Sequence, residues 1–137
     1  MAALAGGPQL ARFRPYRIQI AAGGNALITP DGRFLYDTTT TGIYEFSIDA
    51  ATGALTELAG SPVAYHIVPG PGVIHPSGKF LYVTNADPSV TSDVQLSAWS
   101  IDAQTGALGA ISLSPSAVTA GPQQSVTIDG SGQFAMV

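Results

Sequence analysis

Four side chains in two loop-like stretches of this sequence are the best candidates for chemistry. His66 stands alone in one stretch, while Asn85, Asp87 and Asp93 lie close together in another. Imidazole can transfer a proton near neutral pH. Carboxylates act as general acids or bases, and with amide oxygens they can hold a hard cation. We therefore take His66 and Asp87 as candidate catalytic residues, and Asn85 and Asp93 as candidate ligand-binding residues, with no metal site assigned.

Each candidate also has an ordinary structural interpretation. His66 could be a solvated or locally hydrogen-bonded side chain. The stretch from Asn85 to Asp93 could be a solvated loop in which Asp87-Pro88 starts a turn. The sequence leaves these alternatives open.

Several other chemistries are excluded by the residues present. The chain has no cysteine, which removes disulfides, thiol nucleophiles and cysteine-bound zinc. No Gly-x-Ser-x-Gly motif occurs, so there is no sign of a nucleophile elbow. Residues 130–135 match the dinucleotide fingerprint in letters, yet no helix pattern follows them. We expect no cofactor.

Composition narrows the possible partners. The 137 residues are 45% hydrophobic and 10% charged, with a formal net charge of −4, which is typical of a folded chain and a poor match to nucleic acid. No apolar run approaches the roughly 18 residues needed to span a membrane. The first residues lack the features of a signal peptide, so the compartment stays open.

A repeat organises the sequence and positions the candidate residues. Three similar stretches cover residues 29–39, 75–85 and 129–137, and their turn glycines are Gly32, Gly78 and Gly132. A second motif recurs at residues 48–55 and 101–108. In the second unit we expect strands at about 72–75, 79–84, 93–102 and 107–114. Four short antiparallel strands in a unit of this length indicate a propeller blade.

The repeat also separates turns needed for folding from loops free to vary. The turns between the first and second strands, and between the third and fourth, carry the recurring motifs and should share one rim. We therefore interpret His75 as a turn residue. Loops at 38–42, 60–71, 85–92 and 114–123 should share the opposite rim, where a site is expected. Asp37 takes the place of Val83 in the repeat, either at an edge or as a paired carboxylate facing the channel.

We therefore predict an all-β fold, a β-propeller fragment of about two and a half four-stranded antiparallel blades. The blades are expected at residues 25–60, 72–114 and 124–137, the last incomplete. Residues 1–24 are expected to form an N-terminal segment, the outer strand of a preceding blade. In the third strand of each blade, the face with Tyr44, Phe46 and Ile48, or Ser97, Trp99 and Ile101, should be the more buried.

The stretches Pro76–Asn85 and Ile101–Leu108 resemble the Tyr-Val-Thr-Asn repeats of lactonase-type β-propellers, which include propeller-type 6-phosphogluconolactonases and fungal muconate-lactonising enzymes. The resemblance covers about residues 25–137. It implies a seven-bladed parent that hydrolyses a sugar lactone such as 6-phosphogluconolactone. The alternative is a non-enzymatic repeat propeller, a scaffold or ligand-binding module. The expected partners are a small polar or sugar-lactone ligand, and missing blades or self-association to cover exposed edges.

Overall fold

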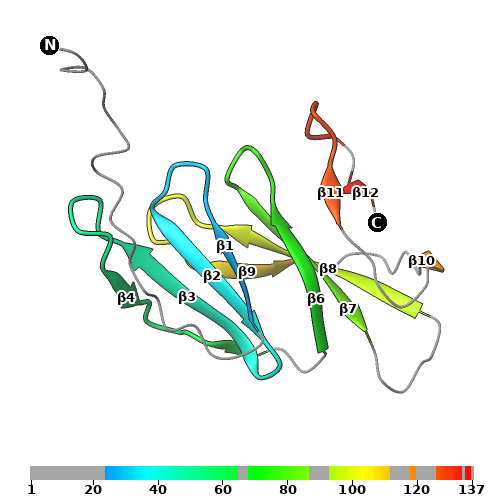
Figure 1. Cartoon of the computed structure of the whole chain (residues 1–137), viewed down its shortest axis with the longest axis horizontal. Coiled ribbons are helices and arrows are strands. Elements are labelled where there is room, and N and C mark those ends of the chain that lie inside the picture. Colours follow the sequence, from blue (N-terminus) through cyan, green and yellow to red (C-terminus); the bar gives the residue numbers. More distant parts are fainter. Residues whose placement is uncertain are drawn as a thin grey trace, which may run out of the picture.

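The computed structural model of the chain is built from strands (Figure 1). The structure describes residues 24–64, 68–86, 93–111, 118–119, 126–133 and 135–136. Within these residues there are twelve strands and no helix. This confirms the prediction of an all-β fold made from antiparallel sheets.

The first sheet is a meander. It consists of β1 (Asn25–Ile28), β2 (Phe34–Thr39), β3 (Gly42–Ile48) and β4 (Leu55–Glu57), each antiparallel to the next. A short strand, β5 (Val63–Ala64), pairs with the start of β3 beyond β4. The second strand is buried along its whole length, as expected for an apolar strand without alternation.

The second sheet repeats this arrangement. It contains β6 (Val68–Ile74), β7 (Phe80–Ala86), β8 (Asp93–Ile101) and β9 (Leu108–Ile111), and β10 (Val118–Thr119) pairs with the start of β8. A third, two-stranded sheet pairs β11 (Thr127–Ile128) with β12 (Ala135–Met136). The innermost strands β1 and β6 lie side by side: a Cβ atom on Gly72 would come within 2.8 Å of Leu27 Cδ1.

The predicted turn glycines occupy equivalent turns. The amide of Gly32 donates to the carbonyl of Thr29 over 2.8 Å, and that of Gly78 donates to the carbonyl of His75 over 2.8 Å. The two glycines have φ angles of 74° and 71°, and Gly132 has a φ of 71°. This is the left-handed region that glycine enters without steric cost, which explains why glycine recurs at this position.

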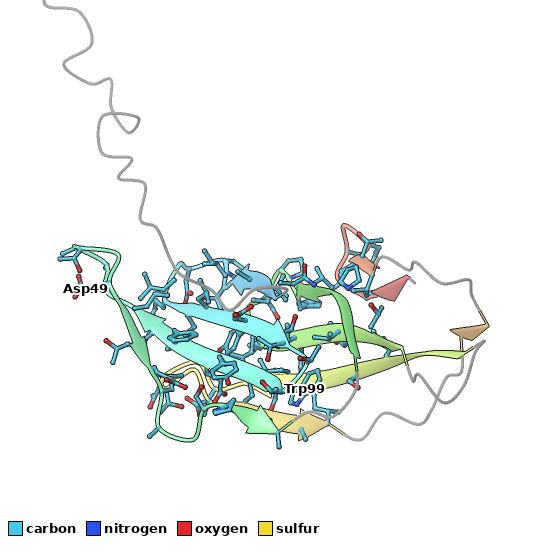
Figure 2. The ribbon with its side chains drawn as sticks, turned by 60° about the horizontal axis from the view of Figure 1, so that its bottom comes forward. Asp49 and Trp99 are labelled. Atoms are coloured by element: carbon cyan, nitrogen blue, oxygen red, sulfur yellow. The ribbon has the colours of Figure 1, made fainter. Side chains whose placement is uncertain are left out.

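The hydrophobic core lies between the first two sheets. The first sheet contributes Phe34, Tyr36 and Ile43, and the second contributes Leu81, Val83, Trp99 and Ile101. Trp99 lies among the crowded side chains in Figure 2, whereas Asp49 is at the tip of the β3–β4 hairpin. Each sheet therefore buries one face against its neighbour, as stacked blades do.

Polar contacts fasten the same two sheets at their edges. The hydroxyl of Tyr36 donates to the carbonyl of Gly106 over 2.7 Å, and the amide of Leu108 donates to Oε1 of Glu45 over 2.7 Å. The guanidinium of Arg33 donates to the carbonyl of Ala103 over 2.9 Å. Because these bonds join the sheets at separate points, they fix how one sheet sits on the other.

Two details differ from the sequence prediction. The fourth strand of each sheet is split in two, so the expected loops at 60–71 and 114–123 contain β5, the start of β6, and β10. In the gap between β4 and β5, the Ser61 hydroxyl accepts the amide of Glu45 over 3.0 Å. A side chain thus replaces one ladder bond, which hydrophobic periodicity does not reveal.

The burial of β3 also differs from the expectation. Tyr44, Phe46 and Ile48 are half-buried, whereas Ile43 and Glu45 are buried. The reason is geometric, because the residues at 43 and 45 face the second sheet and the alternating set faces away from it. In β8 the expectation is confirmed for Trp99 and Ile101, since there the same face packs on the first sheet.

Glu45 makes the stability pH-dependent. Burial raises the pKa of its carboxyl group, although the hydrogen bond from the Leu108 amide acts in the opposite direction. Because the folded state then binds the proton more tightly than the unfolded state, ionisation of Glu45 costs stability as the pH rises above the ordinary value of 4.5. We expect Glu45→Gln, which keeps an acceptor for Leu108, to gain stability relative to the wild type as the pH is raised from 4 to 7. Urea titrations of both proteins at each pH measure this, and a difference independent of pH would contradict it.

Candidate functional site

The sheets have two rims with different character. What we call the turn rim consists of the loops 29–34, 49–54, 75–80, 102–107 and 129–133. Asp49 Oδ1 accepts the amides of Ala51 and Thr52 over 3.0 and 2.7 Å, and Asp102 Oδ1 accepts those of Gln104 and Thr105 over 2.8 and 2.7 Å. These bonds lower the pKa of both carboxyl groups. The carboxylates are thus engaged in holding turns.

His75 is also part of the turn rim. Its Nδ1 accepts the amide of Ser77 over 3.0 Å, which places the ring proton on Nε2. Nε2 then donates to the carbonyl of Gly132 over 2.7 Å, linking the turn of the second sheet to the turn before β12. Both ring nitrogens are occupied, which confirms His75 as a turn residue.

What we call the loop rim lies at the other ends of the strands. It holds the β2–β3 turn at 40–41, the passage from β5 to β6 and the passage from β7 to β8. Two candidate residues are strand residues there by their backbone. Asn85 pairs with Gln95 near the end of β7, and Asp93 begins β8 and pairs with Thr119. The fold therefore brings the backbones of Asn85 and Asp93 onto adjacent strands at one rim.

The two candidate catalytic residues, His66 and Asp87, lie outside the described residues. The strands that flank them are described: β5 ends at Ala64 and β6 begins at Val68, while β7 ends at Ala86 and β8 begins at Asp93. All four strand ends belong to the loop rim. The assignment of His66 and Asp87 to a site there stays a prediction.

Hydroxyl groups at the loop rim stabilise the inner strands. The hydroxyl of Thr84 donates to the carbonyl of Pro71 over 2.9 Å, beside an irregularity in the pairing of β6 and β7. The hydroxyl of Thr39 donates to the carbonyl of Gly42 over 2.9 Å and closes the β2–β3 turn. These threonines hold the rim in shape, so a ligand there would be met by loop residues placed on a fixed frame.

Two buried carboxyl groups in the first sheet stand out from this frame. Glu45 is 2% exposed and accepts the Leu108 amide. Asp37 is 3% exposed, burial raises the pKa of its carboxyl group, and Oδ1 is buried without a hydrogen-bond partner. The repeat alignment singled out Asp37 in advance. No signal in the sequence marked Glu45, because its place in the alternation of β3 predicted a more exposed side chain.

Two searches of the described part of the chain give negative results. No group of three histidine, aspartate or glutamate side chains within it is arranged to hold a metal ion. No helix within it is long and apolar enough to cross a membrane.

Comparison with known proteins identifies the family. The description "Lactonase, 7-bladed beta-propeller" fits residues 35–137, and the chain belongs to this family. A crystal structure of a candidate 6-phosphogluconolactonase from Bacteroides uniformis ATCC 8492 has a similar fold, with a TM-score of 0.64 and 19% sequence identity. The similarity covers 86% of this chain and 33% of that one, so the chain spans about one third of its length. A search of curated proteins gives no match.

Proposed function

We propose that this chain forms part of a propeller that hydrolyses a sugar lactone such as 6-phosphogluconolactone. The observation that supports the proposal is the match of residues 35–137 to the lactonase propeller family, carried by blades with the expected strands. The turn rim is occupied by hydrogen bonds that build the fold, so the loop rim is the better position for a site.

Lactone hydrolysis defines what such a site must do. A water molecule attacks the ester carbonyl, the ring C–O bond breaks, and the ring oxygen takes up a proton as the hydroxy acid forms. A general base that removes the water proton and an acid that protonates the leaving oxygen each accelerate such a step by about 10²–10⁴-fold. Donors aimed at the carbonyl oxygen stabilise the charge of the intermediate.

We assign these roles to the loop rim residues. His66 is proposed as the base, Asp87 as its acidic partner, and Asn85 and Asp93 as groups that bind the hydroxyls or the carbonyl of the sugar. Their side chains come from the two passages that meet at this rim, β5 to β6 and β7 to β8. Such an arrangement needs no cofactor.

The experiment is a panel of lactones tested on the polypeptide that contains residues 1–137. Glucono-1,5-lactone, its 6-phosphate and a simple aliphatic lactone separate sugar and phosphate recognition from general esterase activity. Turnover of a sugar lactone above the spontaneous rate supports the proposal. Binding of these sugars without turnover would favour a ligand-binding module instead, and neither binding nor turnover would reject both.

The active polypeptide should lose activity when the candidate catalytic residues are replaced. We expect His66→Ala and Asp87→Ala each to reduce kcat/KM for the preferred lactone by about 100-fold, because each removes a proton-transfer group. His75→Asn is the matched control, because asparagine can keep a turn acceptor at a histidine on the opposite rim. Equal losses in all three variants would contradict the assignment.

A further inference from the structure

The starting observation is a buried carboxyl group on the face of the first sheet that points away from the second. Tyr36 faces the second sheet, since its hydroxyl bonds to Gly106 there. Successive residues of a strand point to opposite faces, so Asp37 points the other way. It shares that far face with Leu35 and with its partners across the ladder, Tyr44 and Phe46.

Asp37 has no compensation for its burial. The side chain is 3% exposed, and Oδ1 is buried without a hydrogen-bond partner. The space beside it is closed by the start of the sheet, because a Cβ atom on Gly24 would come within 2.0 Å of Oδ1. A buried, unpaired carboxyl group is costly, and such groups are normally paired or bonded.

The repeat shows what normally fills this place. Moving 46 residues along the chain takes Gly32 to Gly78, and likewise Asp37 to Val83. Val83 is fully buried in the core between the two sheets. It packs in the same cluster as Ile43, and Val63 of β5 lies directly opposite Ile43 in the ladder. This interface is therefore apolar at both repeat positions, 63 and 83.

The same shift, applied backwards from Val63, leads to an arginine. The residue 46 positions before Val63 is Arg17. A segment packed on the far face of the first sheet as β5 packs on the second would thus bring Arg17 toward Asp37. At both positions the repeat exchanges an apolar residue for a charged one, and the two charges are opposite.

We propose that residues 17–24 cover the far face of the first sheet and that the Arg17 guanidinium pairs with the Asp37 carboxylate. Residues 1–23 lie outside the described part of the chain. The argument rests on charge complementarity, on the register of the repeat and on the connection at Gly24, which touches Asp37. The segment from Arg17 to Gly24 spans seven residue steps, at most about 25 Å when extended, so the pair is within reach.

A double-mutant cycle with the residues of the repeat tests the pair. Removing one partner of a buried ion pair leaves the other charge unpaired, whereas replacing both with apolar residues is close to neutral. We expect Arg17→Val and Asp37→Val each to lower the Tm of the full chain by about 10 °C. The double variant, which recreates the Val63 and Val83 arrangement, should recover to within a few degrees of the wild type.

A control variant and a second measurement keep the test decisive. Arg14→Val removes a nearby arginine whose repeat equivalent is Gly60, an exposed turn residue, and should leave the Tm unchanged. In the wild type, the carboxyl carbon of Asp37 followed by NMR should titrate below the ordinary value of 3.8, because a paired cation outweighs burial. A higher Tm for Asp37→Val alone, additive effects of the two changes, or a titration above 3.8 would each overturn the pair.

Discussion

Replacing Gly106 with alanine is expected to lower the free energy of unfolding by about 3 kcal/mol. Two costs add at this position. The backbone has a φ of 78°, where an L-residue costs about 1–2 kcal/mol. A Cβ atom there would also lie 2.3 Å from Cδ1 of Phe34, and forcing extra atoms into a packed site costs about 1–3 kcal/mol. Phe34 is 5% exposed within the core between the sheets, so its ring has little room to retreat.

The matched control for this prediction is Gly32→Ala. Gly32 has a φ of 74°, and a Cβ atom there would have no neighbour within 4 Å. This change should therefore cost only the conformational part, about 1 kcal/mol. Urea unfolding of both variants separates the two costs. Equal losses at Gly106 and Gly32 would show that Phe34 moves aside freely.

The sequence predicted the features that each blade forms by itself. An apolar run such as Phe80-Leu81-Tyr82-Val83, placed after a Pro-x-Gly turn, specifies a buried strand through local chemistry alone. The turn glycines have positive φ because their amides close the turns, as at Gly32 and Gly78. These signals act over fewer than ten residues, so one sequence is enough to recognise them.

Features that depend on a neighbouring sheet were harder to predict. Glu45 is buried because the edge of the second sheet supplies the Leu108 amide, 63 residues away. Phe46 is half-buried because its face of the first sheet is not the face that packs on the second. Nothing in the alternation of β3 says which of its two faces meets which blade, so the rule of period two gave the less buried face there.

The candidate site shows the same division. The repeat correctly assigned the recurring motifs to one set of turns, which placed Asn85 and Asp93 on adjacent strands at the other rim. Their chemical roles cannot be read from spacing, because loop side chains converge through the packing of blades and not through local periodicity. Asp37 was visible in the sequence only because a second blade offered Val83 for comparison.

Replacing Trp99 with alanine is expected to lower the free energy of unfolding by about 4 kcal/mol, the largest effect of any single change proposed for the core. Trp99 is 5% exposed and lies opposite Leu81 in the second sheet. It belongs to the cluster that includes Phe34 and Tyr36 of the first sheet. Removing a large buried aromatic side chain costs about 3–5 kcal/mol, because burial is lost and a cavity is left.

The location of Trp99 between the sheets adds a second expected result. Since the cavity loosens the contact of both sheets, hydrogen exchange should accelerate in β2 as well as in β7 and β8. Ile28→Ala is the control, because Ile28 is 54% exposed on the far face and its truncation should cost no more than about 0.5 kcal/mol. Faster exchange confined to β7 and β8 would mean that the first sheet is held by its own contacts. Loss of protection in both sheets would instead show that each blade is stable only through the neighbour it packs against.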